Sequence, residues 1–286
     1  MRPNQSKKNY RPSGQAVLPV PRAVLYLIIF LAIQLVVTLV ITFAAGNGWL
    51  PESEMTAIAS GLAAVINCIW MFYVTWRGGI DLLDQSRAVA YAAGDGESRA
   101  PRLVLAVIAI LLLAVAANIC LNGVIQISGI KEIDPLFKRI NTTLNEGSYT
   151  MQMITFGLLV PLSEEIAFRG ILYRSIRQRL GGTSIPILIA SLIFAVYHGN
   201  LTQGIYAFFV GVLLCVVCEA GGLVLSILLH IGINITSIIG NTLPAYTRLI
   251  GGAAERWPVI AVSGVVTILL LFAVLRLLLF VKPSRV

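Results

Sequence analysis

The chain has 286 residues, of which 57% are hydrophobic and only 12% are charged, and its formal net charge is +8. A mean hydropathy of +0.87 excludes an ordinary soluble domain and indicates an integral membrane protein. The basic excess does not predict a nucleic-acid partner, because Lys and Arg flank apolar runs and form no basic stripe with interleaved aromatic residues.

The first 22 residues form a basic tail, and the first apolar run begins directly after it. This run continues for more than twenty residues without a small-residue cleavage site, as in a retained membrane anchor rather than a removed signal peptide. We therefore expect residues 1–22 to be a cytoplasmic tail and residues 23–286 to be one integral membrane domain.

The rest of the chain is divided into apolar runs of the length that a membrane helix needs. A bilayer core about 30 Å thick requires about 20 apolar residues per helix. The pattern predicts an all-α, polytopic transmembrane bundle of about eight membrane helices, in which the fifth to seventh runs are short and closely spaced. These runs span residues 23–45, 54–76, 102–127, 150–175, 184–199, 203–220, 222–241 and 257–281.

The distribution of Lys and Arg predicts the orientation of these helices. With eight crossings, 15 basic residues fall on the side of the N-terminal tail and five on the other side, leaving out Arg169 inside the fourth run. Cytoplasmic loops carry the excess of positive charge, so we expect both termini in the cytoplasm.

Two polar segments connect the apolar runs, and the cysteines lie within the runs. We expect residues 77–101 to be a flexible connector and residues 130–147 to include a short amphipathic stretch on the membrane surface. All four cysteines lie in apolar runs. We interpret them, including the C-x-x-C pair Cys215 and Cys218, as small buried hydrophobic residues rather than metal ligands or disulfide partners.

The fourth run contains charged residues in "PLSEEIAFRGIL", residues 161–172. An ionisable group at membrane depth costs about 2.5 to 3.5 kcal/mol on insertion scales and usually faces a cavity with a function. Glu165 and Arg169 have the i, i+4 spacing of a helical ion pair, whereas Glu164 is rotated by about 100°. We expect Arg169 to neutralise and orient Glu165, and Glu164 to point elsewhere. The alternative is a purely structural ion pair that joins two helices.

The two histidines of the chain also lie in apolar runs. His198 follows Phe194 by four residues, and His230 precedes Asn234 by four residues, which places His230 and Asn234 on one helix face. A single buried histidine is usually a packing residue. Two histidines, an acid pair and an asparagine inside spans instead favour one polar site, because imidazole exchanges protons near neutral pH and binds divalent metals.

The order E-E-x-x-x-R, F-x-x-x-H and H-x-x-x-N on successive membrane helices resembles the three motifs of the CPBP family. That family includes the type II CAAX prenyl endopeptidases and the bacterial Abi or bacteriocin-processing proteins. The resemblance covers about residues 155–240, places the catalytic core at about 150–241, and implies an intramembrane protease acting on a membrane-associated peptide or protein.

The resemblance implies a role for each motif residue. Glu164 is the expected general base, and His198 helps it to hold the attacking water. His230 and Asn234 are expected to stabilise the tetrahedral oxyanion, and Arg169 is expected to hold Glu165 ionised. A second version places Zn²⁺ on Glu164, His198 and His230, with an open position for water. The residues suit both versions about equally, with a slight preference for the metal-free one because it gives Asn234 a role.

Two functions other than proteolysis are also compatible with the sequence. A non-catalytic scaffold or bacteriocin-immunity protein of the same fold would keep the motifs without the reaction. A small transporter would use Glu164, Glu165 and Glu219 as a proton relay, although the halves of the chain show no repeat. Nothing in the sequence selects the substrate, its prenylation, or the oligomeric state.

Overall fold

A computed structural model describes residues 17–83, 86, 99–243, 246 and 257–279, and these residues are almost entirely helical, with no strand. The basic tail before residue 17, most of the expected connector and the C-terminal basic residues lie outside the described residues. In chain order the elements are α1 (Val20–Gly46), η1 (Glu52–Glu54), α2 (Met55–Arg77), α4 (Arg99–Ile127), α5 (Ile130–Ile133), α6 (Pro135–Glu146), α7 (Tyr149–Ile154), η2 (Thr155–Leu159), α8 (Val160–Glu165), η3 (Ile166–Tyr173), α9 (Arg174–Leu180), α10 (Ser184–Tyr197), α11 (Leu201–Gly221), α12 (Leu223–Thr242) and α14 (Trp257–Leu279).

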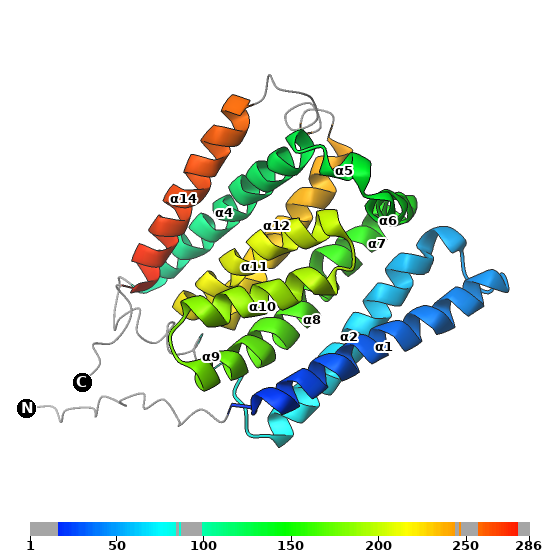
Figure 1. The fold of residues 1–286 in the computed structure, drawn as a ribbon, viewed down its shortest axis with the longest axis horizontal. Coiled ribbons are helices and arrows are strands. Elements are labelled where there is room, and N and C mark those ends of the chain that lie inside the picture. Colours follow the sequence, from blue (N-terminus) through cyan, green and yellow to red (C-terminus); the bar gives the residue numbers. More distant parts are fainter. Residues whose placement is uncertain (1–16, 84–85, 87–98, 244–245, 247–256, 280–286) are drawn as a thin grey trace, which may run out of the picture.

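Seven helices in the described part of the chain are long and apolar enough to cross a membrane. They confirm the polytopic helix bundle, and α7 to α9 form one of them as a continuous segment of 32 residues, Tyr149–Leu180. The fifth run, expected to be short and to span 184–199, is present as α10, which is shorter than the seven spans. Helix α10 has only 14 residues, about 21 Å at 1.5 Å per residue, because the polar turn after Tyr197 ends it. Although only seven helices in the described part of the chain have the length of a span, the start of α1 and the end of α14 lie at the same end of the bundle (Figure 1).

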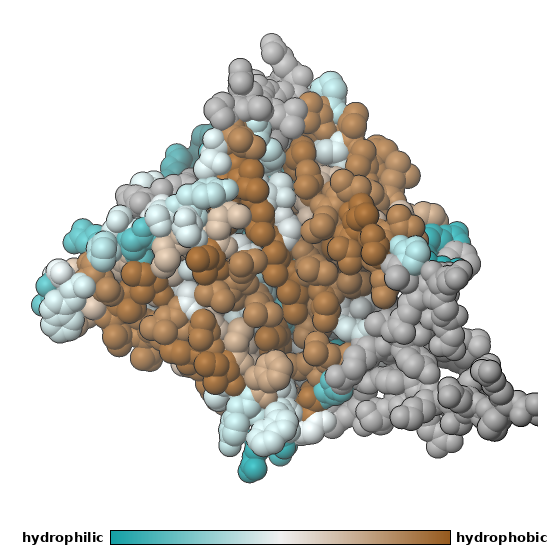
Figure 2. Space-filling model, turned by 180° about the vertical axis from the view of Figure 1, so that it is seen from behind, coloured by the Kyte–Doolittle hydropathy of each residue, from teal (hydrophilic) through white to brown (hydrophobic). Residues whose placement is uncertain are grey.

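The outer surface of the bundle is apolar, as expected for contact with lipid. Leu35, Phe43 and Ile69 each expose 60% or more of their side chains. Figure 2 shows apolar residues across the middle of one face and hydrophilic residues at its edges. Trp49 and Trp76 lie exposed near helix ends, where tryptophan is enriched at membrane interfaces. The chain is therefore a multi-pass integral membrane protein.

Two apolar clusters hold the helices together. One joins α4, α11, α12 and α14, and the other joins α1, α2, η3 and α10. Leu223 of α12 belongs to the second cluster, whereas Leu229 and Ile233 of the same helix belong to the first. Helix α12 thus lies at the junction of the two clusters, and it carries His230 and Asn234.

The expected amphipathic stretch is present as the short helices α5 and α6. Helix α6 begins with Pro135 in its first turn, and the Asp134 side chain caps it by accepting a hydrogen bond from the Phe137 N–H. Its exposed residues include Lys138 and Arg139. The helix contacts α2 and α11, so it lies across one end of the bundle.

Candidate active site

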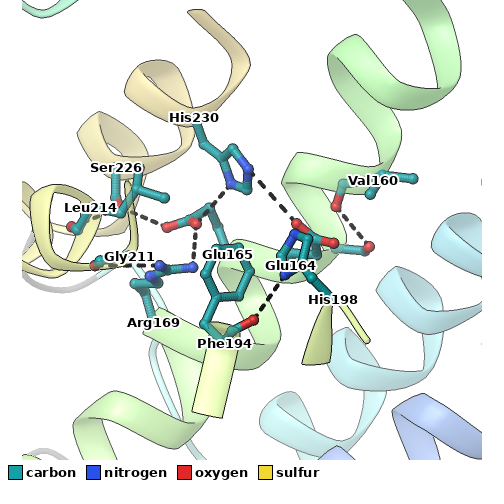
Figure 3. A network of polar contacts seen from close by, with 11 residues as sticks. Val160, Glu164, Glu165, Arg169, Phe194, His198, Gly211, Leu214, Ser226 and His230 are labelled. Atoms are coloured by element: carbon teal, nitrogen blue, oxygen red, sulfur yellow. Dashed lines mark hydrogen bonds and ion pairs between the residues drawn. The ribbon is translucent and has the colours of Figure 1, made fainter. Parts of the chain in front are cut away.

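The candidate site is assembled from three segments that are distant in sequence (Figure 3). Glu164 and Glu165 end α8, and Arg169 follows in η3. His198 directly follows α10, and His230 lies in the middle of α12. These segments bring Glu164, Glu165, Arg169, His198 and His230 into one cluster inside the bundle.

The backbone around the two acids contains two π-helical segments, η2 before α8 and η3 after it. Pro161 has no N–H to continue an α-helical ladder, and the wider π turn at Thr155–Leu159 precedes it. Such π segments are frequent at functional sites because they re-aim the side chains next to them. Here they flank the acid pair on both sides.

Glu165 is the centre of the hydrogen-bond network and is 0% exposed. Its Oε1 accepts from Arg169 Nη1 at 2.8 Å and lies 3.0 Å from His230 Nδ1. Its Oε2 accepts from the Ser226 hydroxyl at 2.6 Å. This confirms the expected ion pair between Glu165 and Arg169. The contacts favour an ionised carboxylate that holds one nitrogen of His230 in place.

Arg169 is 1% exposed and makes further contacts besides its ion pair with Glu165. Its Nη2 lies 3.4 Å from the carbonyl oxygen of Gly211, and its guanidinium lies 4.3 Å from the centre of the Phe194 ring. A Cβ at position 211 would meet Ser191 at 3.2 Å, so glycine permits the close approach of α10 and α11 there. Arg169 is therefore a buried fixed cation with a stacked aromatic partner.

Glu164 occupies a different environment from its neighbour. Its Oε2 lies 3.7 Å from His230 Nε2, which is longer than a hydrogen bond. Glu164 is only 4% exposed and lies within electrostatic reach of His198. The two adjacent acids thus point to different partners, with Glu165 tied to a buried cation and Glu164 facing the imidazoles.

The bonds of His198 indicate its tautomer. Its Nδ1 lies 2.8 Å from the carbonyl oxygen of Phe194, one helical turn earlier. A carbonyl oxygen only accepts, so Nδ1 carries the proton and Nε2 is left as an acceptor in the neutral ring. The Phe194 ring packs against both imidazoles, with centroid distances of 4.8 Å to His198 and 5.9 Å to His230.

Asn234 lies one turn beyond His230 on α12, as predicted, but its amide is engaged outside the cluster. Its Nδ2 donates to the carbonyl oxygen of Phe156 at 2.8 Å, which joins α12 to the π segment η2. The same nitrogen has a second N–H that a role at an oxyanion would use. The catalytic roles assigned to Glu164, His198, His230 and Asn234 stay predictions.

Ser226 belongs to the site but was not predicted. It is 0% exposed, and besides Glu165 its hydroxyl lies 3.0 Å from the carbonyl oxygen of Leu214. The sequence does indicate that Ser226 shares a helix face with the site residues, because polar side chains occur every four residues at Ser226, His230 and Asn234. Serine is common in membrane helices, so the spacing alone does not identify it.

The arrangement does not fit a ready zinc site. Among the described residues, no three His, Cys, Asp or Glu side chains are grouped closely enough to hold a metal ion. Nδ1 of His230 is bonded to Glu165 and Nδ1 of His198 to a carbonyl, as in many metal-binding histidines, so their Nε2 atoms stay open. What the arrangement lacks, within the part of the chain that the structure describes, is a grouping of three side chains around one point.

The third acid of the transporter alternative, Glu219, has its own hydrogen-bond partners. Glu219, near the end of α11, accepts hydrogen bonds from the Tyr173 hydroxyl at 2.9 Å and from Arg177 Nη2 at 3.0 Å. This cluster ties α11 to η3 and α9. Cys215 and Cys218 are buried on the same helix.

Comparison with known proteins gives two findings. Residues 146–236 match the family model described as type II CAAX prenyl endopeptidase Rce1-like. An uncharacterized 24.3 kDa protein of Escherichia coli is 26% identical over 198 residues, which cover 67% of this chain and 80% of that protein. No solved structure gives a significant match. The matched segment contains every residue of the candidate site.

Proposed function

We propose that this chain is an intramembrane endopeptidase, because residues 146–236 match the model of a protease family, the Rce1-like type II CAAX prenyl endopeptidases. It hydrolyses a peptide bond in a membrane-associated protein or peptide, and the bacterial relative suggests a bacterial plasma membrane as its location. One observation carries the proposal: His230 bridges a fixed acid and a second acid, with 3.0 Å from Nδ1 to Glu165 and 3.7 Å from Nε2 to Glu164.

The proposed reaction begins with a water molecule held by Glu164 and by Nε2 of His198. Glu164 takes a proton from the water while the water oxygen attacks the peptide carbonyl carbon. His198 has the tautomer that this step needs, because its only ring proton points to the Phe194 carbonyl. No nucleophilic serine or cysteine is needed, and the attacking oxygen comes from water.

The tetrahedral intermediate then requires donors for its negative oxygen. In this proposal His230 acts as an imidazolium: its Nδ1–H stays on Glu165 and its Nε2–H donates to the oxyanion, together with the free N–H of Asn234. The carbon–nitrogen bond breaks as the leaving nitrogen receives the proton that Glu164 took from water. Arg169 does not touch the substrate; it keeps Glu165 charged and in position.

A substitution of one carboxylate separates this proposal from a scaffold or immunity function. Glu164→Gln keeps the size of the side chain and removes the base. Membranes from cells that express the wild-type or the Glu164→Gln protein at equal levels should differ in specific cleavage products, measured by peptidomics. If the two peptide profiles are identical while the phenotype of the protein persists, the chain acts as a scaffold and the proposal is wrong.

The substrate class can be tested with purified protein in detergent. Matched peptides ending in a prenylated or an unprenylated CAAX sequence, and a bacteriocin-type leader peptide, cover the classes that the family suggests. We expect cleavage of at least one of these by wild-type protein and none by Glu164→Gln. Selective cleavage of the prenylated peptide would identify the lipid as part of the recognition.

A further inference from the structure

Asp134 is a buried carboxylate outside the candidate site, with both oxygens engaged. The residue is 6% exposed and lies between α5 and α6. Oδ1 accepts from the Phe137 N–H at 3.0 Å, in the first turn of α6. Oδ2 accepts from the Thr202 N–H at 2.8 Å, in the first turn of α11. One carboxylate therefore caps two helices that are 65 residues apart in the chain.

The second of these bonds lies next to His198. Only the residues Gly199, Asn200 and Leu201 separate His198 from Thr202. Asn200 caps α11 by accepting from the Gln203 N–H at 2.9 Å, and its own amide lies 3.3 Å from the carbonyl oxygen of His198. The turn is thus fixed at its α11 end by two caps, and one of them comes from Asp134.

The short length of α10 makes this turn important. α10 ends at Tyr197, and the chain reverses through Gly199 in the left-handed region, at φ +73°. His198 is therefore held by the last turn of α10 on one side and by the capped start of α11 on the other. If the α11 end of the turn moves, the imidazole loses one of its two fixed points.

We infer that Asp134 is a positioning residue for His198: by capping α6 and α11 with one carboxylate, it fixes the turn from which His198 faces Glu164. The importance of this contact for catalysis rests on the proposed function, but the contact itself can be tested without it. The surface helix α6 is thereby coupled to the site through a path of four residues, from Asp134 to Thr202, Asn200 and His198.

The competing explanation is that Asp134 only stabilises α6 as an ordinary helix cap. Asp134→Ser separates the two explanations. Serine is as good a cap as aspartate, so its hydroxyl keeps the bond to Phe137, but a single oxygen does not bridge to Thr202. Asp134→Asn serves as a second variant of nearly the same shape, in which one of the two acceptors becomes a donor.

The histidine content of the chain provides a direct probe. It has two histidines, so labelling with ¹⁵N-histidine gives the ring signals of only His198 and His230, which a His230→Gln variant assigns. In wild-type protein in detergent, we expect His198 with its proton on Nδ1. In Asp134→Ser and Asp134→Asn, we expect the His198 ring signals to shift towards a mixture of tautomers, with the His230 signals unchanged.

Hydrogen exchange provides the second readout. The Thr202 amide should exchange about tenfold or more faster in Asp134→Ser, as expected when its bond to Asp134 is removed. Asn47→Ala is the control: it removes the bond from Asn47 to the Phe43 carbonyl at the end of α1, a contact that includes no residue of the candidate site. This control should leave the His198 signals and the Thr202 amide unchanged.

The kinetic arm uses the peptide that wild-type protein cleaves. A positioning role predicts a kcat about tenfold lower in the Asp134 variants with KM within about twofold, because misplacement of a reacting group acts mainly on the chemical step. If Thr202 exchanges faster but the His198 signals and kcat stay at wild-type values, Asp134 is only a cap and the inference fails. If wild-type protein cleaves no peptide, the proposed function fails, and the ring signals alone decide the inference.

Discussion

Arg169 and Glu165 form an ion pair in which Nη1 and Oε1 are 2.8 Å apart and both side chains are buried, at 1% and 0% exposure. A charge at this depth is tolerated because its partner and several hydrogen bonds compensate it. Arg169 also contacts Gly211 of α11, and Glu165 contacts Ser226 and His230 of α12, so the two side chains join three helical segments. The adjacent Glu164 lies outside the pair, so one helix turn carries a structural acid and a candidate catalytic acid.

Removal of one partner should be far more harmful than removal of both. Arg169→Met leaves the Glu165 carboxylate buried without its cation, and we expect the free energy of unfolding to fall by about 3 to 5 kcal/mol. The double variant Arg169→Met with Glu165→Gln should recover at least about half of this loss. Denaturation in detergent, followed by circular dichroism, measures both. Equal losses in the single and double variants would show that the pair does not stabilise the fold.

The two acids should separate stability from activity. Glu164→Gln should abolish peptidase activity while its melting temperature stays within about 2 °C of wild type, because Glu164 makes no ion pair with Arg169. Glu165→Gln should also lose activity but melt at least about 6 °C lower, since it leaves Arg169 buried with an uncompensated charge. A Glu164→Gln protein that melts as low as Glu165→Gln would refute this division.

The parts of the site that the sequence predicts are those with a short-range pattern. The i, i+4 spacing gives the Glu165–Arg169 pair and the common face of His230 and Asn234. The position of Asn234 next to Phe156 was not predictable, because it depends on where a π segment places a carbonyl 78 residues away. Ser226 was missed for a similar reason: its partner lies on another helix.

The fold shows the same division between local and long-range information. The long apolar runs mark seven helices correctly, and the short fifth run marks α10 to within two residues, because a polar turn directly follows Tyr197. Asp134 carries a local signal, an Asp before a Pro, that predicts a helix start. The same signal contains nothing about Thr202, which only the packing of α6 on α11 brings within 2.8 Å.

A metal-free reaction predicts insensitivity to chelators. No three potential ligands are grouped as a zinc site among the described residues. We expect purified protein to contain substoichiometric zinc and to keep its activity, within about twofold, after prolonged treatment with a strong chelator. Loss of activity that one equivalent of Zn²⁺ restores would instead support the version with zinc on Glu164, His198 and His230.

A second polar network should stabilise α12 independently of the acids. Asn118 of α4 is 0% exposed, and its Nδ2 lies 3.1 Å from both the Ile233 carbonyl oxygen and the Tyr206 hydroxyl. Asn118→Ala leaves these groups without that partner, and we expect a loss of about 1 to 3 kcal/mol in the free energy of unfolding. Tyr206→Phe removes the hydroxyl but keeps Asn118 bonded to the Ile233 carbonyl, so it should cost less. Equal, negligible effects of both changes would contradict a role for this network.

The cap at Asp134 should make stability depend on pH in a predictable direction. The N–H groups of Phe137 and Thr202 stabilise the charged carboxylate and hold the pKa of Asp134 below its ordinary value of 3.8. The folded form therefore binds this proton less readily than the unfolded form. Its contribution to stability is fully present above the ordinary pKa and is lost as the pH falls through the lower pKa of the folded state.

The difference between wild-type and Asp134→Asn protein isolates this contribution. Asparagine does not titrate, so we expect the melting temperature of wild type to exceed that of the variant by a constant amount from pH 7 to about pH 5. Below about pH 4 the two melting curves should converge as Asp134 becomes protonated, while groups common to both proteins cancel in the difference. A gap that widens on acidification would mean that the carboxylate is not the stabilised form, and the double cap would have to be abandoned.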